Sequence, residues 1–253
     1  MFEEKTLGLV DTHAHLEEFQ NLEGLVARAK KAGVIGIVAV GVGYDSNIKT
    51  LELSKTYEGY IFPAIGIHPW EVEGNVEEGI GFIERRVDDC VAIGEIGLDY
   101  WIKTSKERQN KVFEKLLEIA VKKDKLISVH SRGAWEEAYN IVEKFDIKKA
   151  AFHWYSGPLE ILRKTLDRGY YVSASPAAEY SKKHREALQQ TPLENLLLET
   201  DSPVEYKRVK SEPADVLKTL KYVAELKGIR EEALAERTTE NAVKLFRLKL
   251  SQL

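Results

Sequence analysis

The sequence predicts an α/β fold, a (β/α)8 TIM barrel with additional C-terminal helices packed outside. The length of 253 residues fits the usual size of such a barrel, roughly 250 residues. Eight short apolar runs alternate with longer segments whose apolar residues have helical spacing. The runs are continuously apolar, as is typical of parallel strands covered on both faces. No linker or break in composition is evident, so residues 1–253 are expected to form a single domain.

The eight runs are the expected strands. In chain order they are Leu7–Asp11, Val34–Val42, Ile61–Ile67, Val91–Ile96, Leu126–His130, Ala150–His153, Tyr170–Ser173 and Leu196–Thr200. Two last helical stretches, Ala214–Lys227 and Arg230–Leu250, should pack outside and close the barrel.

An open doubly wound sheet is the alternative fold for alternating strands and helices. Such a sheet, when it binds nucleotides, usually carries a Gly-rich phosphate loop after its first strand. Here the first run leads into Asp11-Thr12-His13-Ala14-His15, which is no phosphate loop. The count of eight runs also favours the barrel.

Composition and charge exclude several function classes. The net charge is −4, so the protein has no global basic field of the kind that binds duplex DNA. Cys90 is the only cysteine, which excludes an intrachain disulfide and multi-thiolate metal sites, and we expect it to be a small core residue. Met1–Lys5 lacks the start of a signal peptide, and no run approaches the roughly 20 apolar residues of a membrane span. We therefore expect a cytoplasmic protein that associates with no membrane and has no obligate protein partner.

Histidines and acids gather at the ends of the expected strands. Five of the six histidines lie at or just beyond a strand's C-terminal end, as do two acids. In a parallel barrel these ends open on one face, where the loops build the site. The converging residues are His13, His15, His68, Glu95, His130, His153 and Asp201. The sixth histidine, His184, is expected in a solvated helix and is left out.

The residue types at these positions indicate a metal site. Imidazole nitrogens and carboxylate oxygens are ligands for Zn²⁺, Mn²⁺ or Mg²⁺. The pleat points His13 and His15 the same way, so one ion can take both. Glu95 can bridge two ions, and Asp201 would complete the first ion's ligands and accept a proton from a shared water. Two ions roughly 3.5–4 Å apart activate such a water. The expected ligands are His13, His15, Glu95, His130, His153 and Asp201.

Short motifs at the strand ends cover nearly the whole chain. In order they are Val10-Asp11-Thr12-His13-Ala14-His15-Leu16, Gly66-Ile67-His68-Pro69, Gly94-Glu95-Ile96-Gly97-Leu98-Asp99-Tyr100, Val129-His130-Ser131-Arg132, Phe152-His153, Glu199-Thr200-Asp201-Ser202-Pro203 and Thr239-Glu240-Asn241-Ala242. This ordered set resembles the TatD family of metal-dependent deoxyribonucleases, within the amidohydrolase superfamily.

The resemblance implies hydrolysis of DNA phosphodiester bonds, as an exonuclease, with two divalent ions (Zn, Mg or Mn) as cofactors. It implies metal-ligand roles for the six residues above, with Glu95, Asp201 and His68 as catalytic residues. His68 and Arg132 are the expected contacts to the phosphate, because a guanidinium fork matches phosphate oxygens. The alternative for Arg132 is a structural salt bridge.

The chain departs from the family pattern on the substrate side. Trp154-Tyr155-Ser156-Gly157 follows His153 where a Cys-Phe pair is common, and Gly133 stands where an Asp often occurs. The loop Val204–Ser211 lacks the usual Arg-Gly and Asn pattern. Cations and tryptophans also follow several strands, which suits a single DNA strand or a frayed end. They are Lys103, Lys106, Arg108, Lys182, Lys183, Arg185, Lys207, Arg208, Lys210, Trp70, Trp101, Trp135 and Trp154.

Two other function classes stay open. One is another hydrolase of the same superfamily that acts on an ester or amide, for example an aminoacyl ester on tRNA. Glu95 lies where many such enzymes have a carbamylated lysine, which favours the TatD-like branch. The other class is a non-catalytic metal-binding scaffold, and the intact ligand set argues against it.

Overall fold

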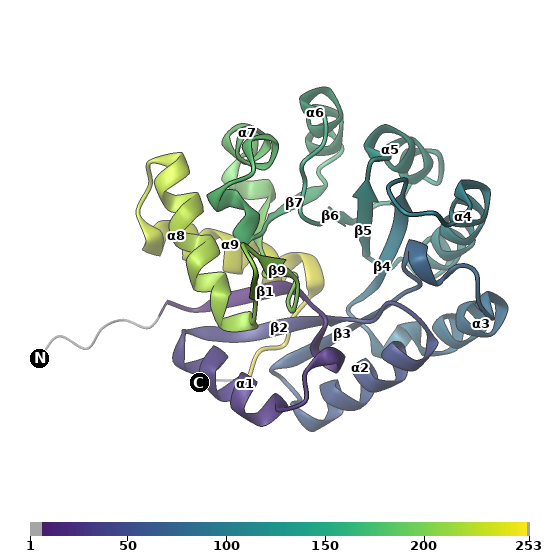
Figure 1. The fold of residues 1–253 in the computed structure, drawn as a ribbon, viewed down its shortest axis with the longest axis horizontal. Coiled ribbons are helices and arrows are strands. Elements are labelled where there is room, and N and C mark those ends of the chain that lie inside the picture. Colours follow the sequence, from purple (N-terminus) through teal and green to yellow (C-terminus); the bar gives the residue numbers. More distant parts are fainter. Residues whose placement is uncertain (1–6, 252–253) are drawn as a thin grey trace, which may run out of the picture.

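Eight parallel strands form one sheet in chain order around a barrel (Figure 1). The computed structural model describes residues 7–251, so the expectation drawn from Met1–Lys5 lies outside the described residues. The predicted fold class is confirmed. The strands are β1 (Leu9–Ala14), β2 (Val34–Val40), β3 (Ile61–Ile65), β4 (Ala92–Asp99), β5 (Ile127–Arg132), β6 (Ala150–Phe152), β7 (Tyr171–Ala174) and β8 (Leu196–Leu198).

Helices surround the barrel and return the chain from each strand to the next (Figure 1). They are α1 (Leu22–Lys31), α2 (Tyr44–Thr56), α3 (Val76–Arg86), α4 (Lys106–Lys122), α5 (Trp135–Lys144), α6 (Leu159–Asp167), α7 (Lys182–Gln190), α8 (Val216–Lys227) and α9 (Glu231–Phe246). Because α8 packs against α7, β1 and β8, it completes the outer ring. The additional helix is therefore α9. No helix of the described part of the chain is long and apolar enough to cross a membrane.

Polar groups close the barrel between β1 and β8. The buried carboxyl group of Asp11 accepts hydrogen bonds from the backbone N (2.9 Å) and Oγ1 (2.6 Å) of Thr200. The backbone N of Asp201 donates to the carbonyl of His13 at 2.9 Å. Burial raises the pKa of Asp11 to about 8, although the bonds from Thr200 oppose the shift. The same contacts place the β1 histidines beside the Asp201 loop.

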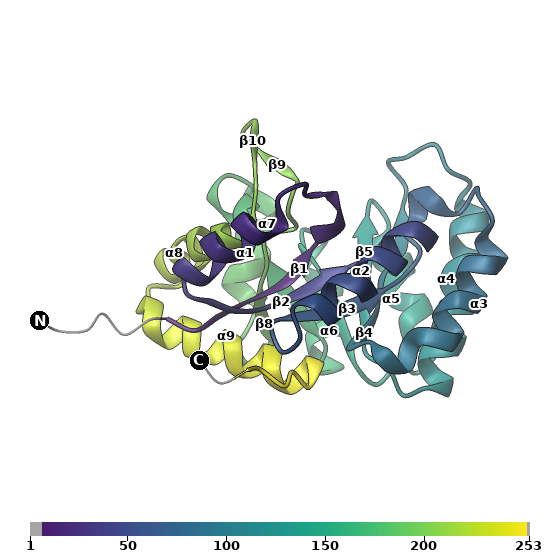
Figure 2. The same cartoon turned by 90° about the horizontal axis from the view of Figure 1, so that it is seen from below.

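Helix α9 lies across one end of the barrel, opposite the hairpin of β9 (Glu205–Tyr206) and β10 (Val209–Lys210) (Figure 2). Its Ala242, Leu245 and Phe246 belong to one apolar cluster with residues of the strands. Asn241 Nδ2 donates to the carbonyls of Leu193 (2.6 Å) and Leu196 (2.8 Å). The C-terminal motif therefore ties α9 to the start of β8, and the site lies at the other end.

Candidate metal centre

The strand ends bring the seven predicted site residues together at the C-terminal end of the barrel. A ring nitrogen of each of the five histidines lies within 3.6 Å of a Glu95 carboxylate oxygen. Six of the seven residues are buried, and His130 keeps 13% of its side chain exposed. They are His13 and Glu95 within β1 and β4, His130 within β5, and His15, His68, His153 and Asp201 in the segments that follow β1, β3, β6 and β8.

One oxygen of Glu95 faces the histidine pair of the first strand. Its Oε2 lies 3.4 Å from His13 Nε2 and 3.5 Å from His15 Nε2. The Oδ1 atom of Asp201 lies 3.6 Å and 3.4 Å from the same two nitrogens. His13, His15 and Asp201 could thus hold one ion together with this oxygen.

The other oxygen of Glu95 faces a second set of imidazoles. Its Oε1 lies 2.6 Å from His130 Nδ1 and 2.8 Å from His153 Nε2. These two nitrogens are 3.2 Å apart. The carboxylate of Glu95 therefore lies between two groups of donors, one on each oxygen.

The donors fit a divalent cation. The Nε2 atom of His13 is buried and has no hydrogen-bond partner among residues 7–251, although buried polar atoms are nearly always paired. It points toward the carboxylates of Glu95 and Asp201. Nitrogen and carboxylate donors without a thiolate suit Zn²⁺, Mn²⁺ or Mg²⁺.

Both central carboxylates are stabilised in the ionised form. Burial opposes the charge on Glu95, yet the neighbouring imidazoles of His153 and His130 hold its pKa well below the usual range. Burial likewise opposes the charge on Asp201, and the hydrogen bond with His15 lowers its pKa. Asp201 also has a left-handed backbone, with φ of 50°. Strain of this kind in a residue other than glycine is common at functional sites.

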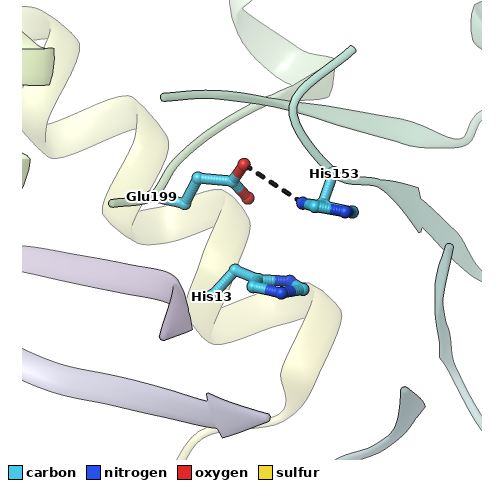
Figure 3. Close-up of side chains that lie close together, drawn as sticks. All are labelled: His13, His153 and Glu199. Carbon is cyan, nitrogen blue, oxygen red and sulfur yellow. Dashed lines mark ion pairs between the residues drawn. The ribbon is translucent and has the colours of Figure 1, made fainter. Parts of the chain in front are cut away.

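Oxygen acceptors lie beside the second ring nitrogen of three of the histidines. The Nδ1 of His15 lies 2.9 Å from the carbonyl of Val40. The Nε2 of His130 lies 3.2 Å from Asp99 Oδ2, and the Nδ1 of His153 lies 3.5 Å from Glu199 Oε1 (Figure 3). Partners of this kind fix the orientation of ligating histidines and increase their basicity.

Asp99 and Glu199 were not assigned as site residues from the sequence. Both stand in the motifs quoted for the fourth and eighth strands. A usable signal was available for Asp99, because alternate residues of a strand share a face and Asp99 lies four positions from Glu95 within β4, whereas Glu199 lies beyond the end of β8. The structure shows both buried beside the histidines.

His68 differs from the other histidines in the atom that it presents. Its Nδ1 accepts a hydrogen bond from the backbone N of Trp70 (3.3 Å), so we assign the ring proton to Nε2, which lies 3.6 Å from Glu95 Oε1. Burial lowers its pKa well below the usual value, which favours a neutral ring. His68 therefore offers an N–H donor to the site, which suits a contact to a phosphate oxygen.

Arg132 forms the structural salt bridge that was the alternative prediction for this residue. Its Nε and Nη2 atoms lie 2.9 Å and 2.6 Å from Asp99 Oδ2. The side chain is still 47% exposed, and it lines a cavity of about 510 Å³ above the histidines. The ion pair holds the guanidinium at the cavity wall, so both readings are compatible.

The expectation that His184 lies on a solvated face is wrong. The residue is fully buried, with Nε2 accepting from the backbone N of Ser175 (3.1 Å) and Nδ1 at 2.6 Å from the carbonyl of Tyr155. Burial lowers its pKa to about 4. Its spacing from Ala187 and Leu188, which are also buried on α7, matches the i, i+3, i+4 pattern of an inward face.

Acidic partners neutralise part of the predicted cationic clusters. Arg108 pairs with Glu73 at 2.6 Å, and Lys207 pairs with Glu179 at 2.8 Å. Lys183, in contrast, lines a further cavity next to the one above the histidines. The clusters are therefore a less uniform binding surface than the sequence indicates.

Comparisons with known proteins agree with this geometry. Residues 10–247 match the family model described as TatD related DNase. The human deoxyribonuclease TATDN3 is 32% identical and covers 95% of each chain. A metal-dependent hydrolase of Bacillus subtilis is 33% identical over 95% of this chain and 99% of its own. The crystal structure of a TatD homologue from Escherichia coli superposes with a TM-score of 0.89 at 25% identity, over 94% and 98% of the two chains.

Proposed function

The chain belongs to the TatD related DNase family and is a metal-dependent hydrolase of ester bonds; on that premise we propose that it cuts phosphodiester bonds of DNA from a strand end. The position of Glu95 carries the proposal, because its two oxygens face separate groups of nitrogen donors. We assign residues 1–253 to a single hydrolase domain.

We assign two divalent ions to this site. His13, His15 and Asp201 would hold one ion, His130 and His153 would hold the other, and Glu95 would be shared between them. When bound, such a pair of ions supplies a nucleophilic water at neutral pH and stabilises the leaving oxygen. Glu95 and Asp201 are ionised in advance by the surrounding imidazoles, which prepares them for cations.

Three side chains serve the reaction directly. Asp201 keeps a low pKa and is placed to accept a proton from the attacking water. His68 directs its Nε2–H into the site, where it can donate to a phosphate oxygen. Arg132, held by Asp99, presents its remaining N–H groups to the phosphate, a geometry that suits bidentate contacts.

The cavity above the histidines favours a strand end as the substrate. Its volume of about 510 Å³ lies in the range of small-molecule sites, roughly 300–1,000 Å³, so it can admit a nucleotide but not a duplex. Trp70, Trp101 and Trp154 line it together with Arg132. Aromatic faces stack on bases of any sequence, which suits a single strand or a frayed end.

The decisive experiment is a nuclease assay with metal titration. The metal-free protein is titrated with Mg²⁺, Mn²⁺ or Zn²⁺ and given end-labelled single-stranded DNA, and bound metal is counted in parallel. We expect Glu95→Ala and Glu95→Gln to lose one of the two proposed ions and most of the activity, while Glu194→Ala, at an exposed glutamate, keeps both. A fully active Glu95→Ala protein would refute the mechanism.

The same preparation separates the alternative functions. Ester and amide substrates, including an aminoacyl ester on tRNA, are assayed beside DNA. Hydrolysis of one of these substrates without cleavage of DNA would indicate that the protein is an ester or amide hydrolase of the superfamily and not a nuclease. If chelation leaves every activity unchanged, the protein is not a metal-dependent enzyme.

A further inference from the structure

A second cavity of about 950 Å³ adjoins the one above the histidines; we call it the side cavity. It lies among the segments after β4, β5, β6 and β7, including the first turns of α5, α6 and α7. The two cavities have five lining residues in common, so they lie side by side. The shared residues are Trp101, Arg132, Trp135, Ser156 and Ser181.

Trp101 forms an exposed aromatic face at this junction. It is 76% exposed, and the guanidinium carbon of Arg132 lies 5.7 Å from the centre of its ring. A Cβ atom on Gly133 would come within 2.6 Å of Cδ1 and Nε1 of this indole, and Gly133 has a φ of +73°. A glycine is therefore required for the ring to lie against this turn, while much of the indole stays open to a ligand.

A second indole is seated in the same way. A Cβ atom on Gly157 would lie 2.5 Å from Cγ of Trp135, and the ring of Tyr155 lies 4.4 Å from that of Trp135. Gly133 and the segment that ends at Gly157 are two of the places where the sequence departs from the family motifs. Both departures make room for a tryptophan of the side cavity.

The charges around the side cavity suit a neutral ring next to an anion. Arg132 lies at the junction, and Lys183 lines the side cavity. The N-termini of the helices that begin there also favour negative charge. Glu136, Glu137 and Glu186 also line the cavity, which disfavours a polyanion inside it. A nucleobase is a planar ring with polar edges. It meets these conditions when the phosphate of its nucleotide remains at the junction.

We propose that the side cavity binds the nucleobase of the nucleotide that carries the scissile phosphate, stacked on Trp101. The inference deepens the proposed function and rests on it. The base enters the side cavity, Arg132 contacts the phosphate at the junction, and the phosphate reaches the histidines through the first cavity. Stacking does not depend on sequence, because every base has a π-face.

Binding of small probes tests the inference without DNA cleavage. Calorimetry compares dAMP with deoxyribose 5-phosphate, which lacks the base, on the metal-loaded protein. We expect dAMP to bind about ten-fold more tightly, the scale of one base stack. Trp101→Ala should abolish the preference and Trp101→Phe should largely restore it. Tyr44→Ala should leave it unchanged, since Tyr44 is an exposed aromatic residue that lines neither cavity.

The outcomes distinguish this inference from the proposed function. Equal affinity for the two probes, or a preference that survives Trp101→Ala, would overturn the side cavity as a base site. Because Trp101 is so exposed, its replacement should leave the melting temperature unchanged, which is measured alongside. A protein that prefers dAMP through Trp101 but cuts no DNA with any metal would contradict the proposed function. It would still support the side cavity as a base site.

Discussion

The Oε1 atom of Glu199 lies 3.5 Å from the Nδ1 atom of His153 (Figure 3). Ser173 Oγ donates to the other oxygen of Glu199 at 2.5 Å, so the carboxylate is fixed. Glu199 is fully buried. Its contact leaves the Nε2 of His153 facing Glu95, at 2.8 Å. We infer that Glu199 orients this imidazole for the proposed metal centre.

Replacing Glu199 with Gln should weaken metal binding. The amide keeps the shape of the side chain but loses the negative charge beside Nδ1, and changes of this kind cost roughly 10–100-fold in affinity. Affinity is measured by competition with a chromophoric chelator. Glu194→Gln makes the same chemical change at an exposed position and should have no effect. If Glu199→Gln binds metal as tightly as the unchanged protein, Glu199 has no role in orienting His153.

The barrel was predictable because its signal is repeated eight times along the chain. Each apolar run of the sequence matches a strand, with ends displaced by a few residues. β1 continues past its apolar residues through the polar Asp11–His13 to Ala14, whereas β8 ends at Leu198, before the polar Glu199 and Thr200 that the prediction included. The convergence of His13 and Asp201 was predictable too, since topology alone directs all C-terminal strand ends to one face.

The features that the sequence did not predict depend on which face of a helix or strand is buried. His184 has charged neighbours on both sides in the chain, and its burial follows from how α7 packs on the barrel. Asp99 and Glu199 are acids within or beside apolar strands. Spacing places Asp99 near Glu95, but the imidazole that each acid contacts is visible only in three dimensions. The side cavity depends on Gly133, whose close approach to Trp101 is visible only in three dimensions.

Arg132→Lys should impair substrate binding without unfolding the protein. Lysine keeps a positive charge beside Asp99 but loses the planar fork that matches phosphate oxygens. We expect kcat/KM on single-stranded DNA to fall at least ~10-fold, the cost of one charged hydrogen bond, mainly through KM. Arg108→Lys, at an exposed arginine paired with Glu73, serves as the matched control. An unchanged kcat/KM in Arg132→Lys would leave the residue a structural role alone.

His184 should make the free energy of unfolding depend on pH. Its pKa is about 4 in the folded protein and 6.5 as an ordinary imidazole, so the unfolded state binds a proton more readily between these values. The contribution of His184 to the free energy of unfolding is therefore fully present above pH 6.5. It is lost as the pH drops toward 4, and the loss reaches about 3 kcal/mol. Urea unfolding at a series of pH values measures this slope.

The His184→Gln variant isolates that contribution from those of other groups. The amide keeps a donor and an acceptor for Tyr155 and Ser175 but cannot take up the proton. The variant should be less stable at pH 7, because the ring's fit is lost, and its unfolding free energy should change less between pH 6.5 and 4. Parallel curves for the two proteins would show that His184 does not titrate in this window.

The neighbouring lysines of α7 should differ in their contribution to DNA binding. Lys182 is 86% exposed and lies 3.8 Å from Glu186, whereas Lys183 lines the side cavity. Charge reversal at Lys183 should weaken the binding of single-stranded DNA and reduce the dependence of log K on log salt by about 0.7, the effect of one lost phosphate contact. Lys182→Glu alters the net charge equally and should leave that slope nearly unchanged. Fluorescence anisotropy over a range of salt concentrations measures both, and equal effects of the two variants would indicate a response to overall charge instead of a contact at the side cavity.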